Sequence, residues 1–255
     1  HMRLLLLGGT AQAKWLAKAC IDNGINCIYS IAGLVRTPEL SCPINIGGFS
    51  QSGGLHAFIK RENISAIMDA THPYAQKMSD QAVCSAKECG IPVWRYQRPA
   101  WEKTPLDIWQ EHDDWPTLLA AIKGYQSVFL TAGQPSEAVL KVLNEYQKKG
   151  QQQTLRTAVP CEHVLPKNMD WIKAIGPFSW QQEFELIASR KIDALISKNS
   201  GGSATQEKLK VAKTLGINVH MLKRPELKKC DKEFNDLKTS VNFVTSWFKN
   251  NERVI

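Results

Sequence analysis

Two glycines near the start of the chain lie where a dinucleotide could bind. Gly8 and Gly9 follow a run of four leucines and precede a predicted helix over residues 11–23. At such a turn glycine lets the backbone approach a pyrophosphate, and the start of the helix offers unpaired N–H groups. The turn departs from G-x-G-x-x-G, because Thr10 replaces the second glycine and Ala13 the third. It therefore indicates either a dinucleotide site or only a tight structural turn.

The end of the second predicted strand offers two further cofactor contacts. In an NAD site an acidic residue that binds the ribose lies about twenty residues beyond the glycine turn, and here that place holds Ser30 and Ile31. We expect Ser30 to contact the ribose and Arg36 to reach a 2′-phosphate. The alternative for Arg36 is a solvated arginine in a polar loop.

The segment DATHPYA, residues 69–75, ends the third predicted strand. Asp69, Thr71 and His72 should therefore project from the same edge of the sheet as Gly8. The proline after His72 keeps the backbone extended, which presents the ring. Asp69 and His72 are candidate catalytic groups, or else Asp69 caps the next helix and His72 bonds to the backbone. A metal site is less favoured, because no third ligand lies close in sequence.

In the second half, the segments LTAG (130–133) and SKNSGGSAT (197–205) repeat the order of strand, polar glycine turn and helix start. Ser203 and Gln206 form a capping-box pattern that predicts a helix N-terminus. A lysine beside glycine backbone and a helix N-terminus favours an anion, although Gly-Gly could serve only the turn. The predicted substrate-binding residues are Thr131, Gly133, Lys198, Asn199, Ser200, Gly201, Gly202 and Thr205.

Alternating strand and helix patterns position these turns and predict an α/β protein with two Rossmann-like open parallel sheets. The expected strands cover residues 3–7, 26–31, 65–69, 92–96, 127–130, 155–159, 171–175, 194–197 and 218–222. The expected helices cover residues 11–23, 55–62, 74–89, about 203–215 and 237–250. Three prolines and three tryptophans indicate a connection over residues 97–116. A boundary near Gly124 separates a dinucleotide-binding domain, residues 2–124, from a substrate-binding domain, residues 125–255.

Composition narrows the class of partner. The net charge of +8, from 32 Lys and Arg against 24 Asp and Glu, favours an anionic partner. The basic residues are dispersed without a recognition motif, so we expect a small polycarboxylate or phosphate compound and no nucleic acid. Seven cysteines without a C-x-x-C pair indicate reduced thiols in a cytoplasmic protein and no metal site. No apolar run is long enough for a membrane span, and we expect a monomer or weak dimer.

An ordered set of motifs resembles the precorrin-6A reductase family of corrin (vitamin B12) biosynthesis, including its cobalt-precorrin-6A members. The set covers nearly the whole chain and is specific as a set. The matching segments are LLLLGGTAQA (4–13), SIAG (30–33), IGGF (46–49), DATHPYA (69–75), RPAW (98–101), VFLTAG (128–133), GPF (176–178), IDALISKNSGG (192–202) and KRP (223–225).

The resemblance implies two Rossmann-like domains and hydride transfer from NADH or NADPH to a double bond of a ring-contracted tetrapyrrole, giving (cobalt-)precorrin-6B. The family often has an arginine after SIAG and after LTAG, where this chain has Leu34 and Gln134; these departures affect NADPH preference and one substrate contact. Trp101 either stacks on the macrocycle or packs in the fold. The residues assigned to the cofactor are Gly8, Gly9, Thr10, Ala11, Ser30, Arg36, Thr71 and His72.

Two other functions agree with the turns alone. Another NAD(P)-dependent oxidoreductase, such as a sugar-nucleotide epimerase, would usually carry a Tyr-x-x-x-Lys pair, and YAQK at residues 74–77 lacks that spacing. A non-catalytic dinucleotide sensor would have no use for the anion-binding turn of the second half.

Overall fold

The computed structural model describes residues 1–33 and 38–252 and divides into two compact α/β units. The first unit comprises His1–Pro99 and Pro225–Ile255, and the second comprises Ala100–Arg224. No helix within the described ranges is long and apolar enough to cross a membrane.

A six-stranded parallel sheet forms the centre of the first unit, in the order β12-β5-β4-β1-β2-β3. Its strands are β1 (Leu4–Leu7), β2 (Cys27–Ile31), β3 (Ile44–Ile46), β4 (Ala66–Asp69), β5 (Val93–Tyr96) and β12 (Lys232–Phe234). Its helices are α1 (Ala11–Asp22), the 3-10 turn η1 (Ser50–Ser52), α2 (Leu55–Arg61), α3 (Gln76–Cys89) and α8 (Leu237–Glu252).

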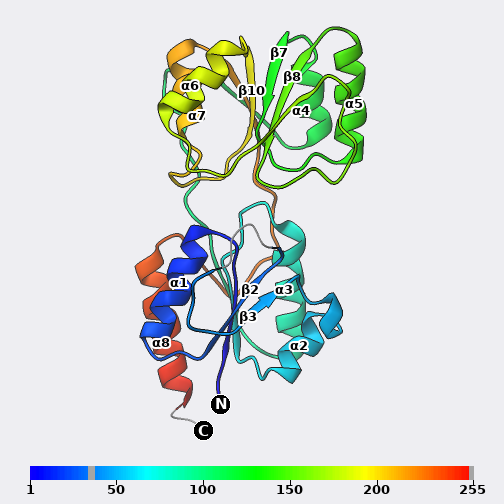
Figure 1. Ribbon diagram of the computed structural model, residues 1–255. Helices are drawn as coiled ribbons and strands as arrows, with labels where there is room; N and C mark the ends of the chain where they lie inside the picture. The colour runs from blue at the N-terminus through cyan, green and yellow to red at the C-terminus, as the bar shows by residue number, and fades with distance from the viewer. Residues whose placement is uncertain (34–37, 253–255) are drawn as a thin grey trace. The chain divides into compact units, whose positions relative to one another are not determined.

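Helices cover both faces of this sheet. Figure 1 shows α1 and α8 side by side on one face, and α2 and α3 on the other. Leu4 and Leu6 pack into the cluster that includes α1 and α8, whereas Leu5 and Leu7 pack into the cluster that includes α2 and α3. Because successive side chains of a strand point to opposite faces, a strand buried on both sides must be apolar throughout, as β1 is.

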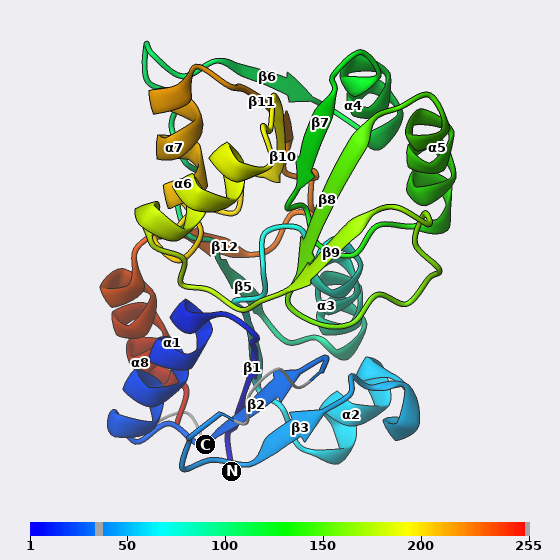
Figure 2. The ribbon, with the colours of Figure 1, turned by 45° about the horizontal axis from the view of Figure 1, so that its top comes forward.

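The second unit repeats the arrangement, with the sheet order β6-β11-β10-β7-β8-β9 and parallel pairing throughout. Its strands are β6 (Trp109–His112), β7 (Ser127–Leu130), β8 (Gln152–Thr157), β9 (Asp170–Lys173), β10 (Ala194–Lys198) and β11 (Asn218–Leu222). Its helices are α4 (Trp115–Ile122), α5 (Glu137–Lys148), α6 (Trp180–Ser189) and α7 (Glu207–Leu215). In Figure 2, α6 and α7 lie on one side of this sheet and α4 and α5 on the other.

The strand order reverses once in each sheet. The reversal lies between β1 and β4 in the first unit and between β7 and β10 in the second. Ligands of open α/β sheets bind at the carboxyl ends of the strands on either side of such a reversal. The prediction of an α/β protein with two Rossmann-like sheets is confirmed, and the predicted functional turns follow these four strands.

The division of the chain differs from the predicted boundary at residue 124, which separated residues 2–124 from 125–255. The segment predicted as a connection contains β6, which pairs with β11 of the second sheet, and α4 packs on that sheet too. At the other end, β12 pairs with β5 and α8 packs on α1, which returns the C-terminal segment to the first unit. These short edge strands carry mixed polar sequences, WQEH and KEF, so their periodicity does not identify them.

Candidate functional site

Thr10 fixes the turn between β1 and α1. As N-cap of α1, its hydroxyl accepts a hydrogen bond from Ala13 N at 3.0 Å and donates one to Ala70 O at 3.1 Å. The hydroxyl therefore closes the helix terminus and ties it to the turn after β4. The amides of Ala11 and Gln12 belong to the first helical turn, which has no intrahelical acceptors for them.

Tyr29 of β2 supports the glycine pair, a role that its position in an apolar strand did not reveal. Gly9 N donates to Tyr29 Oη at 3.0 Å. A Cβ added to Gly8 would overlap Tyr29 Cζ, so the ring fills the space that a side chain would need. Burial raises the pKa of the Tyr29 phenol, which keeps it protonated.

Gly9 has a different environment from Gly8. Its φ is +111°, which disfavours any side chain, and a Cβ there would meet no atom within 4 Å. Space thus lies open in front of Gly9 beside the start of α1.

Ser30 is buried and faces the edge strand β3. Its hydroxyl accepts a hydrogen bond from Asn45 Nδ2 at 3.1 Å, and the same amide donates to Gly48 O at 3.0 Å. Its own carbonyl accepts from Gly8 N at 2.8 Å. Ser30 therefore links the glycine turn to the GGF segment, and a ribose contact stays a prediction. Leu34 and Arg36 lie outside the described residues.

The Asp69 carboxylate has structural partners. Its Oδ1 accepts hydrogen bonds from Thr71 N at 3.1 Å and Thr71 Oγ1 at 2.6 Å. Its Oδ2 lies 3.5 Å from Arg95 Nε in an ion pair between side chains that are almost fully buried. Arg95 also donates to Lys228 O at 2.9 Å. The expected helix cap is wrong, because Asp69 closes the turn at Thr71 and α3 begins later, at Gln76, without a side-chain cap.

One ring nitrogen of His72 bonds to the backbone of its own segment. Its Nδ1 accepts a hydrogen bond from Tyr74 N at 3.2 Å, so the proton of the neutral ring lies on Nε2. The rings of His72 and Tyr74 lie 5.6 Å apart. The backbone contact agrees with the structural interpretation.

A narrow hollow with no room for a water molecule lies at the carboxyl ends of β1, β4 and β5. Arg98, which follows β5, donates through Nη1 to Gln12 Oε1 at 3.2 Å. Neither residue was assigned from the sequence, although Arg98 begins the RPAW motif. The hollow is lined by Thr10, Gln12, Ala70, Thr71, Pro73, Tyr96 and Arg98.

In the second unit, Lys198 comes together with the turn after β7. Lys198 ends β10, and a Cβ added to Gly133 would lie 3.3 Å from its Nζ. Burial lowers the pKa of Lys198 from its ordinary value. Thr131 donates its hydroxyl to Ile196 O at 2.7 Å, which fixes the two strand ends side by side. Lys198 and Gly133, far apart in the sequence, thus share one site.

Asn199 positions its loop instead of presenting its amide as predicted. Its Oδ1 accepts from Trp101 N at 2.7 Å and its Nδ2 donates to Trp101 O at 3.0 Å. Trp101 Nε1 in turn donates to Gly202 O at 2.7 Å. Arg224 donates to the carbonyls of Asn199 and Ser200 at 2.8 and 3.3 Å. The Trp101 ring therefore packs as part of the loop.

The helix terminus expected beside Lys198 is displaced. The predicted capping box at Ser203 and Gln206 is wrong, because α7 begins at Glu207 and Gln206 makes no side-chain cap. Residues 203–205 form a bend before the helix. The loop between Lys198 and α7 instead depends on Gly201 and Gly202, whose φ angles are +71° and +76°. Thr205 lies at the far end of this loop.

A buried charged cluster lies under the loop. Arg156 donates to both carboxylate oxygens of Glu183, at 2.5 and 2.9 Å, and its guanidinium lies 3.7 Å from the centre of the Phe178 ring. Lys208 is buried with its Nζ 5.3 Å from the Trp101 ring. Burial, assisted by Arg156, lowers the pKa of Lys208 to about 7.

Gln134, which replaces a frequent arginine of the family, is also occupied. Its Nε2 donates to the carbonyls of Val159 and Pro160 at 3.1 and 2.9 Å. It joins the turn after β7 to the segment after β8.

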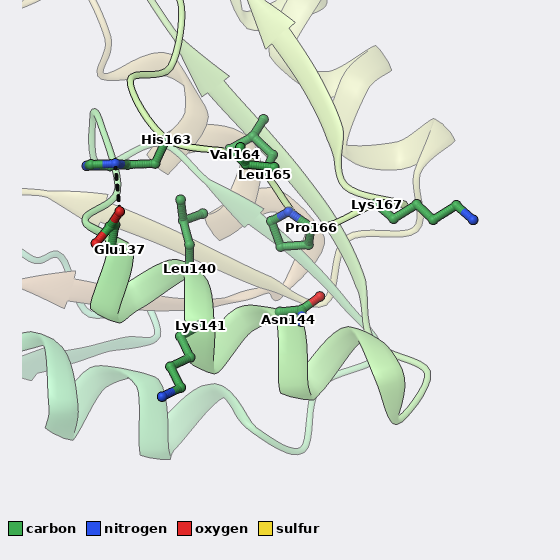
Figure 3. Close-up of a pocket in the computed structure, with 9 residues that line it drawn as sticks. All are labelled: Glu137, Leu140, Lys141, Asn144, His163, Val164, Leu165, Pro166 and Lys167. Atoms are coloured by element: carbon green, nitrogen blue, oxygen red, sulfur yellow. Dashed lines mark ion pairs between the residues drawn. The ribbon is translucent and has the colours of Figure 1, made fainter.

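A further groove in the second unit lies between α5 and the segment after β8 (Figure 3). Glu137 Oε1 and His163 Nδ1 lie 3.5 Å apart across it, and Lys141 and Lys167 point away from each other. It contains none of the predicted site residues. No group of three potential metal ligands occurs within residues 1–33 and 38–252.

A family model described as "Precorrin-6x reductase CbiJ/CobK" matches residues 3–245 of the chain. The chain is similar to the precorrin-6A reductase of Rhodococcus erythropolis, with 33% identity over 245 residues that cover 95% of this chain and 97% of the relative. It is 36% identical over 227 residues to that of Mycobacterium tuberculosis, covering 88% and 90%. A cobalt-precorrin-6A reductase of Synechocystis is 26% identical over 242 residues, covering 87% and 88%.

A solved structure titled "CobK precorrin-6A reductase" has the same fold. It aligns with a TM-score of 0.84 and 31% identity, over 96% of this chain and 97% of that chain. The similarity therefore extends through both units.

Proposed function

Because the chain belongs to the precorrin-6x reductase CbiJ/CobK family, we propose that its first unit binds NADH or NADPH and its second unit binds a ring-contracted tetrapyrrole. The chain is an oxidoreductase of cobalamin biosynthesis of the precorrin-6A reductase type. Its reaction adds a hydride and a proton across one double bond of precorrin-6A or cobalt-precorrin-6A to give the 6B product. Family membership sets aside an epimerase and a non-catalytic sensor.

The turn after β1 supports the cofactor assignment. The open space at Gly9 and the amides in the first turn of α1 suit a diphosphate. The positive φ of Gly9 favours a residue without a side chain, so a diphosphate can approach the backbone there. The nicotinamide supplies the hydride when it is bound. The hydrogen bonds of Tyr29 and Thr10 hold this turn in shape.

The turns after β7 and β10 support the substrate assignment. Lys198, beside Gly133, is the cation that we assign to a substrate carboxylate. Asn199 and Arg224 position the loop backbone around Gly201 and Gly202, whose amides are the other donors to that carboxylate. Asn199 was predicted to contact the substrate directly, and we now assign it to positioning the loop.

The proton that balances the hydride needs a separate source. Asp69 is held by Thr71 and Arg95, so we do not assign it this role. His72, in the turn after β4, stays the protein candidate, with solvent as the other source. Hydride transfer itself depends mainly on orientation and exclusion of water.

The choice between NADH and NADPH is a further proposal. We propose that NADH serves at least as well as NADPH, because Leu34 replaces the arginine that the family often places near the 2′-phosphate. Steady-state rates with each cofactor test the point.

An anaerobic assay with precorrin-6A and with cobalt-precorrin-6A tests the function. We expect the cofactor's absorbance at 340 nm to fall with one of the two substrates. The amounts of oxidised cofactor and of 6B product formed should then be equal. Cofactor binding is measured separately by unfolding temperature, since a ligand at a hundredfold excess over Kd stabilises the protein by about 2.7 kcal/mol. Binding of cofactor without turnover of either tetrapyrrole would refute the proposed reaction.

A further inference from the structure

We propose that Cys27 and Cys42 form a redox-active thiol pair, which a small disulfide such as oxidised glutathione converts reversibly into an intramolecular disulfide. Cys27 begins β2, and Cys42 lies two residues before β3. Both are free thiols in the structure, and neither belongs to the turns that we assign to the cofactor or the substrate. The proposed modification is therefore independent of the reductase reaction.

The pairing of β2 with β3 places the two cysteines opposite each other. The strands are parallel, with Tyr29 opposite Ile44, and Tyr29 N donates to Pro43 O at 3.0 Å. Two residues before this pair, the same register brings Cys27 opposite Cys42. Neighbouring strands lie about 4.8 Å apart, within the Cα–Cα range of about 4.4 to 6.8 Å that disulfides span.

The two side chains also lie on the same face of the sheet. Because side chains alternate along a strand, Cys27 shares the face of Tyr29. Cys27 and Tyr29 belong to the core cluster that includes α1 and α8, and Cys42 packs against that cluster. A hydrogen bond joins the thiols of Cys27 and Cys42. The two sulfurs are therefore close enough to react with each other.

The surroundings give the two thiols different roles. The hydrogen bond with Cys27 lowers the pKa of the Cys42 thiol, and Cys42 is partly exposed. The same hydrogen bond, together with burial, raises the pKa of Cys27, which is only 2% exposed. Since the thiolate is the nucleophile in disulfide exchange, Cys42 reacts first with a dissolved disulfide and Cys27 reacts second.

The exchange has two steps. The Cys42 thiolate attacks one sulfur of oxidised glutathione, which forms a mixed disulfide and releases one glutathione thiolate. The Cys27 sulfur then attacks Cys42 Sγ, the bond to glutathione breaks, and the second glutathione leaves. The protons of the two protein thiols end on the two glutathione molecules. Two protein thiols are thus oxidised while one glutathione disulfide is reduced.

The disulfide would fasten an edge strand. β3 has three residues and ends the sheet order beside β2. It carries Asn45, which bonds to Ser30 of β2 at 3.1 Å. A link between Cys27 and Cys42 closes a loop of about fifteen residues and restricts the unfolded chain, so it should stabilise the first unit.

Peptide mapping after exchange in glutathione buffers tests the pair. The full chain is equilibrated with reduced and oxidised glutathione at several ratios and quenched in acid, and its remaining thiols are alkylated before digestion. We expect peptides linked through Cys27 and Cys42, and dithiothreitol should separate them. Cys27→Ser should instead retain glutathione on Cys42, because the second thiol is missing, and Cys42→Ser should leave Cys27 unmodified.

Cys20→Ser and Cys89→Ser are the controls. Cys20 is buried on α1 in the same core cluster as Cys27, and Cys89 is a half-buried thiol at the end of α3. Both variants should form the link between Cys27 and Cys42 as the parent does. The unfolding temperature of the parent should rise by about 5 to 10 °C on oxidation, and that of Cys42→Ser should not.

A parent that forms no link between Cys27 and Cys42 at any glutathione ratio would overturn the proposal. A link from Cys27 to Cys20, or glutathione that remains on Cys42 of the parent, would overturn it too, since Cys27 would then not displace glutathione. An unchanged unfolding temperature of the linked parent would refute the effect on β3. These measurements need neither the cofactor nor the tetrapyrrole, so they stand even if the proposed function fails.

Discussion

Replacing Lys198 with Met tests the division of roles between the two units. The substitution keeps the length of the side chain and removes the charge beside Gly133. If Lys198 binds a substrate carboxylate, its loss costs a charge-assisted contact of roughly 1.5 to 3 kcal/mol, or about tenfold to a hundredfold in kcat/KM. Stability should be retained or rise slightly, because burial lowers the pKa of this lysine and thus already disfavours its charged form.

The pH dependence gives a second measure of the same contact. Since the pKa of Lys198 is lowered, its charge is lost at a lower pH than that of an ordinary lysine. The parent's KM for the tetrapyrrole should therefore rise as the pH becomes alkaline. Lys198→Met should show a high KM that lacks this alkaline rise.

The assay combines anaerobic steady-state rates with titration of NADH. Lys210→Met is the control, because Lys210 lies exposed on α7 of the same unit, paired with Glu207 at 3.3 Å. Cofactor affinity should be unchanged in both variants. Loss of NADH affinity in Lys198→Met, or parent-like turnover of the tetrapyrrole, would refute the assignment of the substrate to this loop.

Three further predictions concern the cofactor turn, the cofactor preference and acid stability. Gly9→Val should abolish dinucleotide binding while circular dichroism shows a folded protein; binding like that of the parent would contradict the pocket assignment. NADH should support turnover at least as well as NADPH, and a strong NADPH preference that disappears in Arg36→Ala would show instead that Arg36 binds the 2′-phosphate. Burial lowers the pKa of His220 to about 4, so the unfolded chain takes up a proton that the folded chain does not as the pH falls from about 6.5 to 4, which should reduce stability by roughly 3 kcal/mol. Urea unfolding of the parent and His220→Gln at pH 7 and 4 measures this effect, and an identical loss in both would contradict it.

The sequence predicts the buried strands well because their pattern has a single physical cause. A strand covered by helices on both faces is largely apolar, as in β1 (LLLL) and β7 (SVFL). The strands β6 and β12 do not meet this condition, since each lies at a sheet edge and carries charged residues. The division into units depends on where these two strands pair, so it could not be derived from local pattern.

The sequence predicts which turns form the candidate site, but it does not predict which partners their side chains contact. Glycines and polar residues after buried strands locate the four candidate turns. The sequence could not show that Asn199 would bond to the backbone of Trp101, about a hundred residues away, or that Tyr29 would fill the space beside Gly8. Such contacts depend on register between segments, which periodicity does not specify.

Two arginines illustrate why the motifs RPAW and KRP occur where they do. The chain passes from the first unit to the second after Pro99 and returns after Arg224. Arg98 bonds to Gln12 at the cofactor turn, and Arg224 bonds to the carbonyls of Asn199 and Ser200 at the substrate turn. Each arginine precedes a proline, so the backbone at that point is extended and its direction restricted. In each unit, the residue at which the chain passes to or from the other unit is thus hydrogen-bonded to the turn that we assign to a ligand. Substitutions in either motif should therefore alter ligand binding in the unit that holds the arginine, even though neither motif follows a glycine turn.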